Sequence, residues 1–155
     1  MKKLKKLSDN KKPIVVFIYG PIAVGKLTVA NILSKKLRWT LSHNHLLNDL
    51  THGLFARETF VRDNLIEKFR YSLLENAVKE KINFITTHCY AHNYFSKTGL
   101  SDPKYVETLE KKLTKLGAKF YAIHLKASDK ELLHRVGMSS RNKFRKLKDK
   151  KIMRE

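Results

Sequence analysis

The sequence is poor in cysteine and has no long apolar run. Cys89 is its single cysteine, which excludes a disulfide within the chain and is typical of a reducing compartment. No segment approaches the roughly 18 apolar residues of a membrane-spanning helix. The charged start over residues 1–7 is not followed by the apolar stretch of a secretory signal. We therefore expect a cytoplasmic protein with no membrane partner.

Acidic residues are also scarce. The chain has 14 of them against 33 lysines and arginines, a formal net charge of +19 and a pI of about 10.1. Residues 1–12 carry six lysines against one aspartate, and residues 141–155 carry eight basic residues against two acidic ones. We interpret both ends as solvated, with a flexible basic segment over residues 1–12. A dedicated nucleic-acid surface remains the alternative, since basic segments attract polyanions.

No internal repeat and no linker divides the 155 residues, and a hydrophobic content of 42% is enough for one packed core. We therefore expect a single domain over residues 13–155. Within it, apolar runs of strand length alternate with helical patterns. We expect strands at 14–19, 38–42, 82–87 and 119–125, and helices from about 25, over 46–81 with a break near 51–53, over 105–116, and from 128 onward.

This alternation predicts an α/β fold with three layers, in which a parallel sheet of about four to five strands has helices on both faces. Gly117 stands where a helix C-cap favours glycine, and Ser128 with Glu131 has the spacing of a capping box. In such a sheet, ligands bind beyond the carboxyl ends of the strands. The polar segments that follow the strands are therefore the first candidates for a site.

The segment after the first expected strand has the spacing of a phosphate-binding loop, or P-loop. Lys26 follows the second of two glycines that are five positions apart, at the start of a helical pattern. Backbone N–H groups and the helix N-terminus can then surround phosphates, and the lysine can bridge the β- and γ-phosphates. The loop expected to bind ATP consists of Gly20, Pro21, Ile22, Ala23, Val24, Gly25, Lys26, Leu27 and Thr28.

The loop departs from the commonest pattern at the metal position. Leu27 stands where most such loops have serine or threonine, and Thr28 follows it. We expect the Thr28 hydroxyl to face Mg²⁺, directly or through water. The third expected strand ends in Thr87 and His88 and offers no carboxylate to organise the metal. The sequence therefore supports nucleotide binding more strongly than turnover.

Several short segments resemble one family of proteins. The segments are Tyr19–Ala30, His43-Asn44-His45, Arg135-Val136 and Ser140-Arg141. Together they look like small bacterial and archaeal P-loop kinase-like proteins, described as shikimate kinase-like or AAA-type ATP-binding proteins. A threonine displaced by one position is also similar to the loops of adenylate kinase and shikimate kinase. The resemblance covers residues 14–149 and implies a P-loop NTPase fold.

The resemblance also implies roles for residues outside the loop. It places Arg135 against the adenine ring and Arg141 on the phosphates, roles that suit a planar guanidinium. The resembling family continues with a fifth strand and a closing helix. The chain, which ends at Glu155, is therefore interpreted as a C-terminally truncated domain with an incomplete adenine pocket.

Polar residues after the second and third expected strands are candidates for the acceptor side. A kinase needs groups that orient an acceptor hydroxyl and take its proton, a task for His or Asp. The candidate catalytic residues are Lys26, Arg141, His43 and Asp49. The candidates for holding the acceptor are His45, Arg57, Arg62, Tyr90 and His92, and the two arginines would suit an anionic acceptor. Ordinary surface roles for these residues remain open.

These patterns predict an ATP-dependent phosphotransferase that acts on an unidentified small molecule with Mg²⁺. One alternative is a nucleic-acid-associated P-loop protein, such as a polynucleotide kinase or an RNA binder, which the charge of +19 favours. Another is a nucleotide-binding protein without efficient catalysis. A zinc cluster is a weaker alternative, and its ligands would be His43, His45, His88, Cys89 and His92.

Overall fold

The computed structural model describes residues 12–56 and 58–138. The elements are β1 (Ile14–Gly20), α1 (Lys26–Leu37), β2 (Thr40–Ser42), α2 (His45–His52), α3 (Phe60–Lys79), β3 (Phe84–Cys89), α4 (Asp102–Lys115), β4 (Lys119–His124) and α5 (Asp129–Val136). Arg57, Arg141 and most of both basic ends lie outside the described residues, so the predictions on them stay predictions. No helix in the described ranges is long and apolar enough to cross a membrane.

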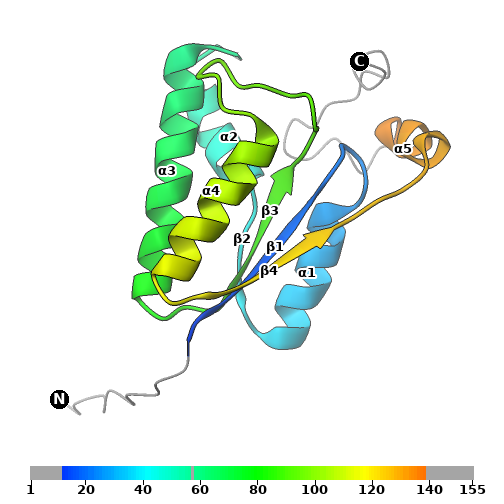
Figure 1. The fold of residues 1–155 in the computed structure, drawn as a ribbon. Coiled ribbons are helices and arrows are strands. Elements are labelled where there is room, and N and C mark those ends of the chain that lie inside the picture. Colours follow the sequence, from blue (N-terminus) through cyan, green and yellow to red (C-terminus); the bar gives the residue numbers. More distant parts are fainter. Residues whose placement is uncertain (1–11, 57, 139–155) are drawn as a thin grey trace.

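Four parallel strands form one sheet in the order β2-β3-β1-β4 (Figure 1). β1 lies in the middle, with Ile18 opposite Thr87 of β3 on one side and Ile123 of β4 on the other. Residues 15–18 of β1 are all buried. This burial on both faces explains why the strand is an unbroken apolar run instead of an alternating one.

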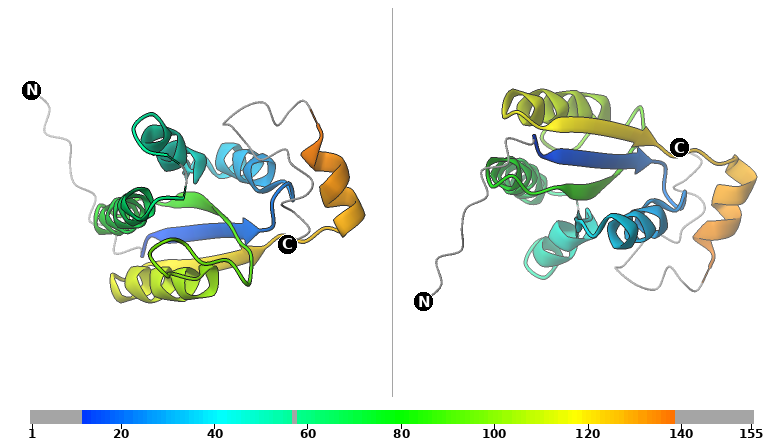
Figure 2. Two further views of the ribbon diagram at one scale, coloured as in Figure 1. Left: turned by 90° about the horizontal axis from the view of Figure 1, so that it is seen from above. Right: turned by 90° about the horizontal axis from the view of Figure 1, so that it is seen from below.

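Helices cover both faces of the sheet, as the views in Figure 2 show for α1 and α4. Phe17 faces one side and packs with α3 and α4, where Leu109 is fully buried. Ile18 faces the other side and packs against Ala30 of α1. Successive residues of a strand point to opposite faces, so β1 contributes to two cores at once. The three-layer α/β fold predicted from the sequence is confirmed.

Side-chain and glycine caps set several helix boundaries. Ser128 Oγ accepts a hydrogen bond from the backbone N–H of Glu131 (3.3 Å), which confirms the predicted start of α5. Ser101 caps α4 in the same way. Gly117 follows α4 with a φ of 93°, the left-handed conformation expected of a glycine after a helix. The break expected near residues 51–53 is the connection between α2 and α3.

The strand boundaries differ from the prediction by one to two residues, and the differences at β3 and β2 have clear causes. β3 extends to Cys89 and does not end at Thr87, because the parallel pairing with β1 continues and places Tyr19 opposite His88. β2 is only three residues long and begins at Thr40. It starts late because Arg38 adopts a left-handed φ of 55° at the end of α1. The correction to β3 matters for function, since it makes His88 part of a rigid strand.

Candidate functional site

The loop between β1 and α1 has backbone conformations that require its two glycines. Gly20 has a φ of 147°, and a Cβ at this position would lie 2.4 Å from the backbone oxygen of Leu125, just after β4. Gly25 has a φ of 99° and is the N-cap of α1. Residues other than glycine rarely adopt such φ values. The motif therefore needs glycine at Gly20 because a side chain has no room there, and at Gly25 because the backbone has a positive φ.

Lys26 begins α1, and its side chain folds back over the loop. The Nζ atom donates hydrogen bonds to the backbone oxygens of Gly20 (2.8 Å) and Pro21 (2.6 Å). No side chain caps the N-terminus of α1, and its first turn holds no acidic residue. Among the described residues, the partial positive charge of the helix end therefore has no acidic residue of its own first turn and no side-chain cap to offset it. The lysine and the helix end form a cradle whose chemistry fits the phosphates of a nucleotide.

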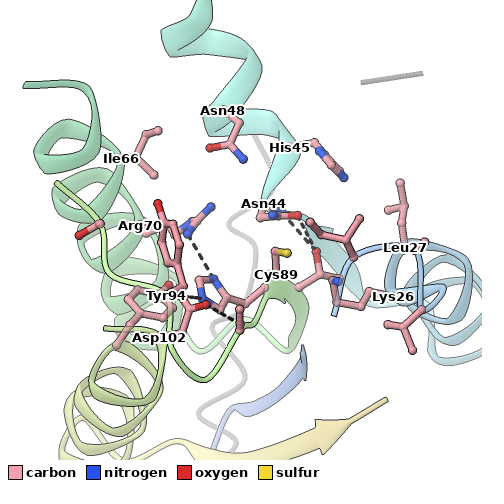
Figure 3. Close-up of a pocket in the computed structure, with 18 of the residues that line it drawn as sticks. Lys26, Leu27, Asn44, His45, Asn48, Ile66, Arg70, Cys89, Tyr94 and Asp102 are labelled. Carbon is pink, nitrogen blue, oxygen red and sulfur yellow. Dashed lines mark hydrogen bonds and ion pairs between the residues drawn. The ribbon is translucent and has the colours of Figure 1, made fainter. Parts of the chain in front are cut away.

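A cavity of about 1210 Å³ begins at this loop and continues between α2, α3 and the connection from β3 to α4. Figure 3 shows Lys26 and Leu27 on one side of it and Arg70 and Asp102 on the other, with Asn44 between them. The predicted site residues that line it are Ile22, Ala23, Val24, Gly25, Lys26, Leu27, Thr28, His45, Asp49, Arg62, His92 and Arg135. The structure thus joins the predicted nucleotide loop and acceptor side in one space.

His43 and Tyr90 are predicted site residues that do not line this cavity. His43 lines a separate small cavity, together with Leu46 and Leu73. Tyr90 packs edge-on against Tyr19, with ring centroids 5.2 Å apart. Its hydroxyl oxygen lies 3.4 Å from Nδ1 of His92, which does line the main cavity. Both residues are therefore neighbours of residues that line the candidate site, since His43 lies beside His45 with ring centroids 5.9 Å apart.

Arg135 reaches the phosphate-binding loop from α5. Its Nη1 atom donates a hydrogen bond to the backbone oxygen of Val24 (3.3 Å), and its Nε atom pairs with the carboxylate of Glu131 on the same helix. A Cβ built on Gly25 would lie 3.9 Å from the same Nη1 atom. The guanidinium that the family resemblance placed against adenine is thus held at the loop, within reach of a nucleotide bound there.

The opposite wall contains a buried hydrogen-bond chain that the sequence did not predict. His88 Nε2 lies 2.9 Å from a carboxylate oxygen of Asp102, and the other carboxylate oxygen accepts the backbone N–H of Ala91 (2.8 Å). An Nη1 atom of Arg70 lies 3.3 Å from His88 Nδ1. An arginine can only donate, so Nδ1 is the acceptor and Nε2 carries the proton given to Asp102. The ring of Tyr105 stacks on His88 with centroids 4.5 Å apart.

His88 is neutral in this arrangement. Burial lowers its pKa from the ordinary value of 6.5, and the charges on Arg70 and Lys26 act in the same direction, while the hydrogen bond to Asp102 opposes them. The effect of Lys26 links this wall electrostatically to the phosphate-binding loop. A neutral ring with a fixed tautomer can hold the Arg70 guanidinium by its acceptor nitrogen.

Two further carboxylates on α3 are used to hold the connection between β3 and α4. Asp63 accepts the backbone N–H of Lys97 (3.0 Å). Glu67 accepts hydrogen bonds from the hydroxyl groups of Ser96 (2.8 Å) and Thr98 (2.7 Å). These contacts fix the connection as a wall of the cavity. They also direct one oxygen of each carboxylate toward the connection.

The structure gives no support to the zinc alternative. Among the described residues, no group of three or more His, Cys, Asp or Glu side chains could hold a metal ion.

At the end of β3, Thr87 exchanges hydrogen bonds with Asn44 through its hydroxyl (both 3.3 Å). Asp102 reaches this end of the sheet from α4, but His88 and Ala91 occupy its oxygens. Thr28 remains the loop hydroxyl in the cavity.

The order of the strands and the loop after β1 define this chain as an α/β protein with a P-loop kinase-like fold. Its sequence matches no described protein family and no curated protein. Solved structures do share the fold. A chain of the Pnkp1/Rnl/Hen1 RNA repair complex aligns with a TM-score of 0.63 and 15% identity, over 84% of this chain and 39% of its own length.

Two shorter proteins share the fold as well. A sugar kinase from Janibacter aligns with a TM-score of 0.55 and 13% identity, over 81% of this chain and 66% of that one. A protein from Chloroflexus aurantiacus aligns with a TM-score of 0.55 and 16% identity, over 82% of this chain and 66% of that one. At such identities the likeness establishes the fold, and activity has to be argued from the site.

Proposed function

We propose that this chain is an ATP-dependent phosphotransferase that acts on a small-molecule acceptor. The observation that carries the proposal is the single cavity that runs from the phosphate-binding loop to the polar wall formed by α2, α3 and β3. A phosphotransferase needs both substrates in one space, because catalysis depends mainly on positioning and charge stabilisation. The sugar kinase with the same fold is consistent with this class.

Each part of the cavity receives a role in this proposal. Backbone N–H groups of the loop and Lys26 bind the β- and γ-phosphates of ATP. Mg²⁺, held by the phosphates, water and the Thr28 hydroxyl, would neutralise charge on the transferring group. Arg135 lies against the adenine and Arg141 contacts the phosphates, as the family resemblance implies. The guanidinium of Arg135 is already at the loop.

The acceptor side is assigned to the wall opposite the loop. Asp49 of α2 lines the cavity and is the proposed proton acceptor for the attacking hydroxyl. His45, Arg62 and His92 line it too and are proposed to hold the acceptor, with Arg57 as a further candidate. Because His43 and Tyr90 do not line the cavity, we propose that they support these residues and do not touch substrate.

Nucleotide binding by the loop can be tested by thermal unfolding with ATP, GTP and ADP, with and without Mg²⁺. We expect a nucleotide to raise the melting temperature of the native chain, and Lys26→Ala to weaken the binding on the order of tenfold or more. Lys36→Ala is the matched control, since Lys36 is an exposed lysine of the same helix outside the cavity. Equal shifts in the Lys26→Ala variant, or none in any protein, would remove the basis of the proposal.

A second candidate function is phosphoryl transfer to, or binding of, nucleic acid. The charge of +19 favours it, and so does the fold shared with a chain of an RNA repair complex. Salt separates the two candidates, because contacts to a phosphate backbone release counterions and lose affinity steeply as salt rises. RNA binding that persists at low salt and falls by about 10³-fold between 50 and 200 mM salt would favour this candidate. Phosphorylation of a small molecule, unaffected by RNA, would exclude it.

A third candidate, nucleotide binding without efficient catalysis, rests on the end of β3. No carboxylate of that strand faces the loop, since its last residues are Thr87, His88 and Cys89. A single-turnover measurement with excess protein distinguishes this candidate from a slow kinase. ATP that stays intact at saturating acceptor would favour a binding role.

A further inference from the structure

Arg70 belongs to the acceptor wall, the side of the cavity opposite the phosphate-binding loop, and it has no ion-pair partner among the described residues. It lies on α3, lines the cavity, and contacts His88 Nδ1 (3.3 Å) and the ring of Tyr105, whose centroid is 5.8 Å from the guanidinium carbon. Neither neighbour carries a negative charge in the folded protein. No carboxylate forms an ion pair with Arg70 within residues 12–56 and 58–138.

The carboxylates near Arg70 are already engaged. Asp102 binds His88 and the backbone of Ala91, while Asp63 and Glu67 bind the connection that follows β3. These hydrogen bonds orient the three carboxylates toward His88, Ala91 and the connection, and none of the three forms an ion pair with Arg70. The positive charge of Arg70, a half-buried residue, therefore faces the cavity without an ion-pair partner among the described residues, and it is available to an anionic ligand.

Arg62 lies two helical turns before Arg70 on the same face of α3. Its Nε atom is buried and has no hydrogen-bond partner among the described residues, and its only ion pair is a long one to Asp63 (3.7 Å). Eight residues of helix span about 12 Å. Ile66 lines the cavity between the two arginines. The wall therefore offers two cationic groups, with an apolar side chain between them.

We propose that Arg70 binds an anionic group of the acceptor, a phosphate or a carboxylate, and that His88 and Asp102 are the positioning residues that hold Arg70 for this purpose. Arg62 is the second contact, nearer the start of α3. This inference rests on the proposed function, since it names the substrate class of the same cavity. An acceptor that is an organic anion follows from it, in place of a neutral polyol.

The hydrogen-bond chain explains how a positioning role works. Asp102 fixes the proton of His88 on Nε2, which leaves Nδ1 as an acceptor aimed at the guanidinium. The ring stacks on Tyr105 and sits on a strand, so it has little freedom to turn. Arg70 therefore keeps its orientation before a ligand arrives, which lowers the entropy cost of binding.

The test uses anion binding in the full chain with the Lys26→Ala substitution, which weakens the other phosphate site. Inorganic phosphate and succinate are the two probes, and glycerol is the neutral one. We expect both anions, or one of them, to bind and glycerol not to bind. Arg70→Gln should weaken the binding at least tenfold, whereas Lys68→Gln, an exposed lysine of the same helix, should leave it unchanged. The stronger of the two anions identifies the acceptor group.

The positioning role is tested by NMR of the histidine ring nitrogens, which reports tautomers directly. We expect the protein without probe to show His88 protonated on Nε2, and saturating anion to shift the Nδ1 signal because the bound negative charge weakens the hydrogen bond that the guanidinium donates to Nδ1. Asp102→Asn should change the tautomer signal and weaken anion binding several-fold while the chain stays folded. This measurement needs no substitution at Arg70, so it remains decisive if Arg70→Gln does not fold.

Two results would overturn the inference. One is anion binding that is as tight in Arg70→Gln as in its parent. The other is a His88 Nδ1 signal that does not move at saturating anion. Neither depends on nucleotide binding. A chain that binds ATP but fails these tests keeps the proposed function and loses the acceptor class, and a chain that passes them without binding ATP loses only the proposed function.

Discussion

His88 Nε2 lies 2.9 Å from Asp102, and this buried contact joins the end of β3 to the first residue of α4. The pair ties a sheet strand to the helix that covers it, directly beneath the candidate acceptor site. Removing one partner of such a pair leaves a buried polar group without its hydrogen bond, which typically costs about 1–3 kcal/mol. Stability and ligand binding are therefore linked at this point.

The first prediction concerns pH. The pKa of His88 is lower in the folded chain than its ordinary value of 6.5, so between these two values the unfolded chain binds more protons. The stabilisation is therefore fully present above about pH 6.5 and is lost as the pH falls through the folded pKa. We expect the free energy of unfolding, measured with urea from pH 8 to pH 5, to decrease on the acid side.

His88→Gln is the variant that isolates this effect. Glutamine keeps an N–H donor for Asp102 but does not titrate in this range. The groups that face the ring, Arg70, Lys26, Asp102 and Tyr105, are the same in both proteins. We expect a flatter acid branch for the variant. An identical pH dependence in both proteins would show that His88 is not held neutral by the fold.

The second prediction concerns the first glycine of the loop. Gly20→Ala places a Cβ 2.4 Å from the backbone oxygen of Leu125 at a φ of 147°. We expect a loss of about 2 kcal/mol or more in urea unfolding, because strain and overlap act together, and weaker nucleotide binding. Gly53→Ala is the control, since nothing lies within 4 Å of a Cβ there and its φ is −67°. A Gly20→Ala protein as stable as this control would contradict the described loop.

The third prediction separates adenine binding from phosphate binding at Arg135. If the guanidinium stacks on the base, Arg135→Met should weaken ATP binding about 2- to 30-fold, the range for a cation–π contact of about 0.5–2 kcal/mol. Binding of inorganic tripolyphosphate should not change. Lys130→Met, an exposed residue of the same helix, is the control. Equal losses for both ligands would reassign Arg135 to the phosphates.

The fourth prediction tests the core that supports the site. Leu109 of α4 is fully buried against the same sheet face as Phe17. Leu109→Ala should lower the free energy of unfolding by about 2–5 kcal/mol through lost burial and a residual cavity. Phe69→Ala, at a side chain that is 49% exposed on α3, should cost much less. Similar losses at the two positions would contradict the packing of α4.

The sequence predicted features that depend on local pattern. β1 and the loop from Gly20 to Lys26 were evident because buried runs and glycine spacing are encoded by neighbouring residues. The start of α5 was evident for the same reason, since Ser128 and Glu131 cap it within one turn. Such signals require no knowledge of which segments meet in space.

The acceptor wall could not be predicted in the same way. Arg70 and His88 are 18 positions apart, and His88 and Asp102 are 14 apart, so only tertiary packing brings them together. In sequence, Asp102 follows a helix cap and precedes a proline, a pattern that indicates a helix start and nothing about ligand binding. The single signal was the polar end of an otherwise apolar strand at Thr87 and His88.

The central place of β1 in the sheet has a consequence for how the chain folds during synthesis. β1 pairs with β3 and β4 but with no nearer strand, and the loop after it touches Leu125, over 100 residues later. The segment that bears the phosphate-binding glycines is made before β3 and β4 but acquires its shape only when β4 has emerged. A nascent chain must therefore keep this buried apolar strand without a partner strand until β3 has been made, a period in which exposed strands are prone to aggregate.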